Sequence, residues 1–261
     1  MCRLAAYLGP EIPLENIIIA PKHSLLEQSQ SANEAKLAVN GDGFGLSWYG
    51  RQQNPGLYKD VLPAWSDGNL SSICRMIHSS IFLAHVRAST VGETSRVNCH
   101  PFAFNNWSFM HNGQIAQFDT IRRRLESSLS DKYYHFRRGT TDSELLFLLL
   151  LSNGLIENPK AAIETVIAMI TCARKQCWKP SRLTCVISDG ESLYAFRYSC
   201  DGKSPTLYIS GNLDSGGRAI CSEPLDGERS NWSAIPESHF VTLSSPGSFA
   251  EPLNVPLSTQ I

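Results

Sequence analysis

The chain has 261 residues, of which 42% are hydrophobic and 18% charged, and its formal net charge is -1 at pH 7. A near-neutral balance excludes the general electrostatic attraction that draws basic proteins to nucleic acid or to an anionic membrane surface. The longest apolar run covers only residues 145–151, far fewer than the roughly 18–20 residues of a membrane-spanning helix. We therefore expect no nucleic-acid partner and no membrane partner.

The cysteines are scattered along the chain without a CxxC pair, and the N-terminus has no apolar signal-peptide region. Such cysteines are typical of reduced, buried thiols in a cytoplasmic protein. No His/Cys cluster has the spacing of metal ligands, and no Gly-rich loop could cradle phosphates. We predict a cytoplasmic protein with no bound metal and no cofactor.

Strand patterns dominate the first half of the chain. Residues 2–8 read as a strand, and glycines at 41, 43 and 45 precede an apolar-aromatic strand. Residues 79–89 and 107–115 are two further apolar runs that predict buried strands. The Asn112-Gly113 pair tolerates positive φ, so we expect a turn there.

Two helices follow a shorter amphipathic one. Asp119 could cap the short helix, in which Ile121, Leu125 and Leu129 recur four residues apart. The first long helix begins with a capping-box spacing, Thr141-x-x-Glu144, and ends near Gly154. The second long helix has Pro159 near its first turn.

The last third returns to strands, beginning with a hairpin around Asp189-Gly190. Strands, then helices, then strands predict an α+β layered architecture in which helices pack on sheets. No linker, repeat or low-complexity tract divides the chain, so we expect residues 1–261 to form a single domain.

Five residues near the ends of these elements are candidates for chemistry: Cys2, Arg87, Asn112, Gly113 and Asp142. Each has a structural explanation when it is taken singly. A buried strand arginine is commonly half of an ion pair, Asn-Gly marks turns, and an aspartate in a helix's first turn is favoured by the helix dipole. Together, however, they supply each group that cleavage of an amino-acid amide requires.

Cys2 is the candidate nucleophile, and its thiol needs a base because a free cysteine is mostly protonated at neutral pH. If Met1 is removed, which a small second residue permits, the α-amino group of Cys2 can act as that base through a water molecule. Attack on an amide carbonyl creates an oxyanion, which the Asn112 side-chain amide and the Gly113 backbone N–H can stabilise. Arg87 offers a planar fork for an α-carboxylate, and Asp142 offers a negative charge for an ammonium group.

The chain resembles the class II glutamine amidotransferases, the Ntn-hydrolase type with an N-terminal nucleophilic cysteine. The resemblance implies a four-layer αββα sandwich with two antiparallel sheets between helix layers. It also implies Cys2 as the nucleophile, Asn112 and Gly113 as the oxyanion hole, Arg87 as the α-carboxylate contact and Asp142 as the α-amino contact. The matching segments are MCR (1–3), NGDGFGLSWYG (40–50), HVRAST (85–90), NCHPF (98–102), MHNGQI (110–115), TTDSE (140–144) and CSEPL (221–225).

Departures from the family pattern indicate a subgroup. Ala88 follows Arg87, where members that pass ammonia to a fused sugar-phosphate synthase carry a tryptophan. The chain also ends soon after the sandwich should close, so we expect no fused synthase domain. Residues 85–90 and 222–225 resemble small stand-alone members, including the γ-glutamyl amidohydrolase of ergothioneine biosynthesis.

We therefore predict an N-terminal-cysteine amidohydrolase that releases glutamate from glutamine through a γ-glutamyl thioester, with ammonia passing to an acceptor or to a separate synthase subunit. Two alternatives stay open. One is a hydrolase of a non-glutamine γ-glutamyl amide, as in ergothioneine biosynthesis. The other is a non-catalytic Ntn-fold subunit that binds a glutamyl ligand. The sequence leaves the oligomeric state open.

Overall fold

The computed structural model describes residues 2–34, 39–88, 93–174, 179–226, 229–245 and 247–255. Met1, on whose removal the proposed base depends, and Cys177 lie outside the described residues. The remaining cysteines are free thiols, but Cys172 and Cys200 are exposed, so the expectation of buried thiols is wrong for these two. Those that are buried are Cys74, Cys99, Cys185 and Cys221.

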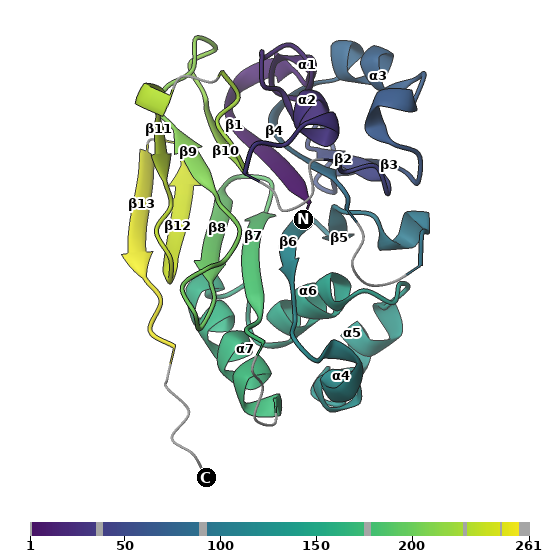
Figure 1. Cartoon of the computed structure of the whole chain (residues 1–261), viewed down its shortest axis with the longest axis vertical. Coiled ribbons are helices and arrows are strands. Elements are labelled where there is room, and N and C mark those ends of the chain that lie inside the picture. The colour runs from purple at the N-terminus through teal and green to yellow at the C-terminus, as the bar shows by residue number, and fades with distance from the viewer. Residues whose placement is uncertain are drawn as a thin grey trace.

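Two antiparallel sheets form the centre of the molecule (Figure 1). The first has seven strands in the order β11-β9-β10-β1-β4-β2-β3, and the second has six in the order β13-β12-β8-β7-β6-β5. The first sheet consists of β1 (Arg3–Pro13), β2 (Phe44–Trp48), β3 (Gly56–Asp60), β4 (His78–Val86), β9 (Tyr208–Ser210), β10 (Arg218–Cys221) and β11 (Trp232–Ala234). The second consists of β5 (Phe102–Phe104), β6 (Trp107–Gln114), β7 (Arg182–Ser188), β8 (Leu193–Tyr198), β12 (His239–Ser244) and β13 (Gly247–Pro252).

Helices cover the outer face of each sheet. Buried side chains of the first group pack on the first sheet, and those of the second group pack on the second sheet; the two groups lie at opposite ends of the view in Figure 1. The first group is α1 (Glu15–Ile18), α2 (Leu25–Gln30) and α3 (Leu70–Met76); the second is α4 (Phe118–Glu126), α5 (Asp131–Phe136), α6 (Asp142–Ser152) and α7 (Pro159–Ala173). This arrangement confirms the predicted four-layer αββα sandwich. None of the helices described here combines the length and apolar character needed to cross a bilayer.

Alternation along β1 decides which side chains enter the space between the sheets. Leu4 and Ala6 pack there against residues of the second sheet such as Met110. Ala5 and Tyr7 point the other way, into the cluster beneath α1, α2 and α3. Because successive side chains of a strand alternate between faces, a residue two positions before Leu4 belongs to the inner face.

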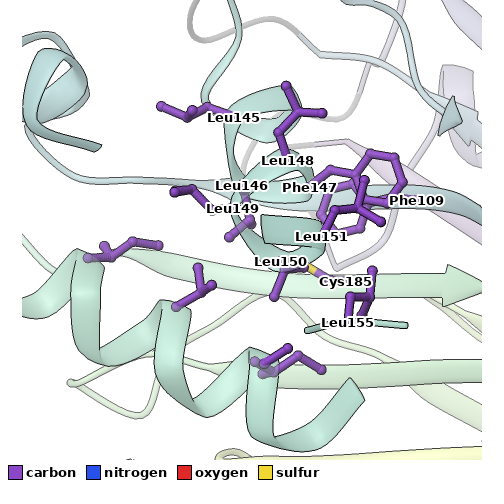
Figure 2. Packing of buried hydrophobic residues seen from close by; sticks show 14 of the residues in the cluster. Phe109, Leu145, Leu146, Phe147, Leu148, Leu149, Leu150, Leu151, Leu155 and Cys185 are labelled. Carbon is purple, nitrogen blue, oxygen red and sulfur yellow. The ribbon is translucent and has the colours of Figure 1, made fainter. Parts of the chain in front are cut away.

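The body of helix α6, residues 145–151, is apolar on all sides and buried throughout. Figure 2 shows its side chains pointing in several directions into the surrounding cluster. The helix contacts α4, α5, α7 and β6, and the ring of Phe147 stacks on that of Phe109 in β6 with centroids 5.2 Å apart. The predicted N-cap is present, because the Thr141 hydroxyl accepts a hydrogen bond from the Glu144 N–H at 3.2 Å. The Glu144 carboxylate does not complete the capping box; it accepts hydrogen bonds from backbone N–H groups of residues 138 and 139 instead.

Three other sequence predictions are confirmed. Pro159 occupies the first turn of α7, and Gly154 takes a positive φ of 88° just after α6. The β7–β8 hairpin turns around Gly190, whose φ is 93°.

Two local predictions were wrong. Asn112-Gly113 does not form a turn; both residues lie inside β6 and pair with β7. The positive φ that the pair suggested does occur, at 145° for Gly113, but pairing with β7 keeps the chain in the sheet. Asp119 does not cap α4, because the cap position is Gln117 in a left-handed conformation and Asp119 is already the second residue of the helix, within its first turn.

The packing of α6 predicts a large cost for removing one of its inner side chains. Leu150 is completely buried, and Leu150→Ala should lower the free energy of unfolding by about 2–5 kcal/mol through lost burial and the cavity left behind. Chemical denaturation measures this loss. Met76, which is 71% exposed, provides the control, and Met76→Ala should leave the stability almost unchanged. Equal losses in the two variants would contradict this account of the core.

Candidate active site

Cys2 stands immediately before β1, at the end of the first sheet. Its thiol accepts a hydrogen bond from the Ala88 N–H, with 3.4 Å between Sγ and N, and lies 3.5 Å from the Ala88 carbonyl oxygen. Ala88 follows the end of β4, which pairs with β1 through Arg3 and Val86. The pairing of β1 with β4 therefore brings the thiol next to residues 87 and 88.

The surroundings of the thiol do not ionise it by themselves. Burial raises the pKa of Cys2 above its ordinary value, and this outweighs the Ala88 hydrogen bond and the charges of Arg3 and Arg87, which lower it. A thiol in this state needs a base before it can attack a carbonyl.

Arg87 is buried, with 3% of its surface exposed. Its backbone N–H donates to the Gly43 carbonyl at 2.8 Å, which fixes it to the start of β2. One guanidinium nitrogen, Nη1, lies 3.5 Å from the Glu93 carbonyl oxygen. Its charge also acts on the Cys2 thiol, so the predicted carboxylate-binding residue lies close to the predicted nucleophile.

Asn112 is completely buried in β6. Within the described parts of the chain, neither its amide nitrogen nor its amide oxygen has a hydrogen-bond partner. Met110, two residues earlier in the same strand, packs between the sheets, so alternation places the Asn112 side chain on that same inner face. Strand β6 contacts both β1 and β4 across this space, and in Figure 1 the N-terminal end of the chain lies beside it.

Gly113 occupies a position that only glycine fits. Its φ is 145°, and a Cβ there would collide with the Arg182 carbonyl oxygen in β7. The backbone of β6 is therefore twisted locally at the residue after Asn112, without leaving the sheet.

Asp142 is buried at the first residue of α6. Its Oδ2 accepts a hydrogen bond from the Ile115 N–H at 2.7 Å, which ties the carboxylate to the chain just beyond β6. The structure thus places Asp142, Asn112 and Gly113 together around the end of β6, and it places Cys2 and Arg87 together at the end of the first sheet.

Three buried histidines lie close to these residues in the chain or in the fold: His85, two residues before Arg87; His111, directly before Asn112; and His100, whose ring contacts that of His85. The rings of His85 and His100 are 4.2 Å apart between centroids, and none of their four nitrogens has a partner among the described residues. Burial lowers the pKa of His85 to about 3 and that of His100 well below its ordinary value. Burial likewise lowers the pKa of His111, whose Nε2 lies 3.1 Å from the Arg182 carbonyl oxygen. All three rings are neutral at physiological pH.

The sequence reasoning missed one feature of the site, the ion pair of Arg3 and Glu223. Arg3 Nη1 lies 2.9 Å from Glu223 Oε1, and both side chains are buried. Arg3 Nε donates to the Cys2 carbonyl oxygen at 2.7 Å. Both residues lie in segments that the sequence analysis quoted for the resemblance, 1–3 and 221–225. A charged residue next to a cysteine, at the start of an otherwise apolar strand, is the signal that could have pointed to Arg3.

No group of three or more His, Cys, Asp or Glu side chains in the described ranges is arranged to hold a metal ion.

Comparison with known proteins identifies the family. The profile described as "Glutamine amidotransferases class-II" matches residues 20–206. The chain belongs to the class II glutamine amidotransferases. Members of this family are enzymes that act on γ-glutamyl amide bonds, in agreement with the resemblance found in the sequence.

Two curated relatives match this amidotransferase over most of their length. The "Probable glutamine amidotransferase DUG3" of Saccharomyces cerevisiae is 33% identical over 93% of this chain and 82% of its own. The "Gamma-glutamyl-hercynylcysteine sulfoxide hydrolase" of Mycobacterium tuberculosis is 26% identical over 95% of this chain and 94% of its own.

Solved structures agree with the fold. A glutamine aminotransferase class-II domain protein from Silicibacter pomeroyi is 34% identical, with a TM-score of 0.75 over 97% of this chain and 99% of its own. The glutamine phosphoribosylpyrophosphate amidotransferase of Bacillus subtilis is 14% identical, with a TM-score of 0.67 over 98% of this chain and 50% of its own. The second likeness shows the fold alone.

The neutral histidines predict a loss of stability in weak acid. An unfolded chain protonates histidine near pH 6.5, whereas His85 in the folded protein does so only at about pH 3. Between these values the unfolded state binds more protons than the folded state, so the free energy of unfolding falls as the pH falls from about 6.5. Denaturant unfolding at a series of pH values measures the slope.

His85→Phe should reduce this slope between pH 4 and 6.5, because it keeps a ring in the core but removes the titrating group. His78, which is exposed at the start of β4, supplies the control variant His78→Phe. A slope unchanged in His85→Phe, or reduced equally in both variants, would refute the role of the buried ring.

Proposed function

We propose that this protein hydrolyses a γ-glutamyl amide bond, with Cys2 as nucleophile and a γ-glutamyl thioester as intermediate. The observation that carries the proposal is the Asn112 amide, which is fully buried on the inner face of β6 without a partner among the described residues. An unsatisfied buried amide costs about 1–3 kcal/mol, so it calls for a functional explanation. The carbonyl oxygen of a substrate, as it becomes an oxyanion, would accept a hydrogen bond from the N–H of the Asn112 side-chain amide.

The first half-reaction uses the thiol. After removal of Met1, the free α-amino group of Cys2 would accept the thiol proton through a water molecule, because the surroundings of Sγ do not ionise it. The sulfur attacks the γ-carbonyl carbon, and the oxyanion accepts hydrogen bonds from the Asn112 side chain and the Gly113 N–H. When the tetrahedral intermediate collapses, the C–N bond breaks and the α-ammonium group gives the proton it took from the thiol to the departing nitrogen, which leaves as ammonia or as a larger amine.

The second half-reaction is hydrolysis of the thioester. Water, deprotonated by the same α-amino group, attacks the carbonyl carbon and the C–S bond breaks, which releases glutamate and restores the thiol. The α-carboxylate of the glutamyl group would bind Arg87 and its α-ammonium would bind Asp142. These two contacts recognise only the glutamyl half of the substrate, so they are compatible with different leaving groups.

Glutamine is the first substrate we propose, since it is the smallest γ-glutamyl amide. A larger γ-glutamyl amide is the second candidate, and one observation favours it: the mycobacterial γ-glutamyl-hercynylcysteine sulfoxide hydrolase matches 95% of this chain. A panel of glutamine, glutathione and γ-glutamyl thioether amides, scored by released glutamate, distinguishes the two candidates.

Cys2→Ala should abolish γ-glutamyl hydrolysis, by more than about a thousandfold, while binding of glutamate or glutamine survives. Released glutamate measures the first effect and calorimetry the second. A wild-type protein that binds but turns over no member of the panel would instead support a non-catalytic glutamyl-binding subunit. Turnover by Cys2→Ala at the wild-type rate would place the nucleophile elsewhere.

Asn112→Ala should lower kcat about 100- to 1000-fold with little change in KM, because an oxyanion donor acts mainly in the transition state. Steady-state kinetics on the best substrate of the panel measure both constants. Asn153→Ala is the control, since Asn153 donates to the Leu149 carbonyl at the far end of α6, and its kcat should stay within about twofold of wild type. An Asn112→Ala effect confined to KM would contradict the oxyanion role.

A further inference from the structure

Arg3 is the residue directly after the proposed nucleophile, and it is completely buried. It lies on the outer face of the first sheet, as Ala5 and Tyr7 do, whereas the Cys2 side chain belongs to the inner face. Its Nε donates to the Cys2 carbonyl oxygen at 2.7 Å. The guanidinium therefore holds the main chain of Cys2 from the side opposite to the thiol.

Glu223 fixes Arg3 in turn. Its carboxylate accepts hydrogen bonds from Arg3 Nη1 at 2.9 Å and from His23 Nε2 at 2.7 Å. Backbone N–H groups of Asn33 and Glu34 donate to the same carboxylate at 3.0 and 2.9 Å. Burial by itself would raise the pKa of Glu223, but these hydrogen bonds and the Arg3 charge together lower it, so the carboxylate is ionised.

Stability alone does not account for this pair. A buried ion pair commonly contributes no more to stability than apolar residues of the same size would, and the neighbouring outer-face positions of β1 hold Ala5 and Tyr7. Arg3 Nη2, moreover, has no hydrogen-bond partner in the described part of the chain. The arrangement instead places a cation at a fixed position beside Cys2.

The charges around the thiol come from several elements. The amino-terminal charge, Arg3 and Arg87 all favour the thiolate, and Cys99 also interacts with the thiol. Glu223 offsets the Arg3 charge; His23, before α2, contacts Glu223, and the charge of Glu34, after α2, also acts on Arg3. Removing one member of the pair should therefore change the thiol pKa in one direction, and removing the other should change it in the opposite direction.

We propose that Arg3 and Glu223 are positioning residues for Cys2: Arg3 holds the carbonyl of the nucleophile, and the ion pair sets the net charge that its thiol experiences. This inference rests on the proposed function of Cys2. It also gives a role to the segment around α2. Residues 23, 33 and 34 of that segment hold Glu223, and Glu223 holds Arg3 in β1.

The test is the pH dependence of Cys2 alkylation by iodoacetamide, followed on the N-terminal peptide by mass spectrometry. Arg3→Met should raise the apparent thiol pKa, which lowers the alkylation rate at pH 7 about threefold or more, because a nearby cation is lost. Glu223→Gln should lower the apparent pKa and raise that rate by a similar factor, because Arg3 is no longer neutralised. A purely structural role would not produce opposite shifts.

Arg3→Lys provides a second test that does not depend on the charge change. A lysine keeps the positive charge but lacks the fork that reaches both the Cys2 carbonyl and Glu223. We expect an alkylation pKa close to wild type together with a kcat about tenfold lower and a nearly unchanged KM. An unchanged kcat would overturn the positioning role.

Matched controls come from the ion pair of Lys160 in α7 and Glu251 in β13. Lys160→Met and Glu251→Gln make the same charge changes where α7 meets the second sheet, and they should leave both readouts at wild-type values. Shifts in the same direction for Arg3→Met and Glu223→Gln, or no shift in either, would refute the inference. The alkylation measurement needs no turnover, so it can refute the role of the ion pair even when Cys2→Ala abolishes hydrolysis. If Cys2→Ala keeps full activity, the proposed function is refuted instead.

Discussion

The hydrogen bonds that hold β1 on both sides are the constraint on which the site depends. β1 pairs with β4 along one edge and with β10 along the other, and the Leu4 N–H donates to the Ser222 hydroxyl as well. Chain ends normally fray unless they are tied down. Here the start of the chain is a central strand of the sheet, so a thiol placed one residue before it has a defined position relative to Ala88 and Arg87.

The second sheet and its helices hold the remaining candidate residues, and they do so by other contacts. β6 carries Asn112 and Gly113 between two neighbouring strands, and α6 adds Asp142 through its hydrogen bond to the Ile115 N–H. An apolar helix enclosed on every side has little freedom to shift, because a shift would open cavities in a close-packed core. The leucine-rich body of α6 therefore does more than stabilise the fold: it keeps the Asp142 carboxylate aligned with the end of β6.

Much of this fold could be predicted from local patterns, and the failures share a cause. Capping by Thr141, the proline in the first turn of α7 and the β7–β8 hairpin are determined by residues close in sequence, and all three were predicted correctly. The Asn112-Gly113 pair was misjudged because pairing with β7, more than 65 residues away in the chain, overrides the local preference for a turn. The capping role of Asp119 was predicted wrongly because Gln117 takes a left-handed conformation, and a glutamine side chain gives no indication of that conformation.

The candidate site shows the same division. The resemblance led to Cys2, Arg87, Asn112, Gly113 and Asp142. The structure places the first two together at the end of the first sheet and the other three around the end of β6. It did not lead to Arg3 and Glu223, because their significance lies in a contact between residues 220 positions apart. Buried polar groups that meet only in the folded protein leave no periodic signal in a sequence.

The central position of β1 also has a consequence for the order in which the protein is made. β1 leaves the ribosome before the other described elements, yet the Leu4 N–H meets its Ser222 partner only after another 218 residues have been added. Until then one edge of β1 has no β10 to pair with. Long-range strand pairing of this kind is slow and leaves the chain prone to aggregation. During synthesis β4 is the first of its two neighbours to become available, so the thiol would reach its place beside Ala88 before the sheet closes on the Glu223 side.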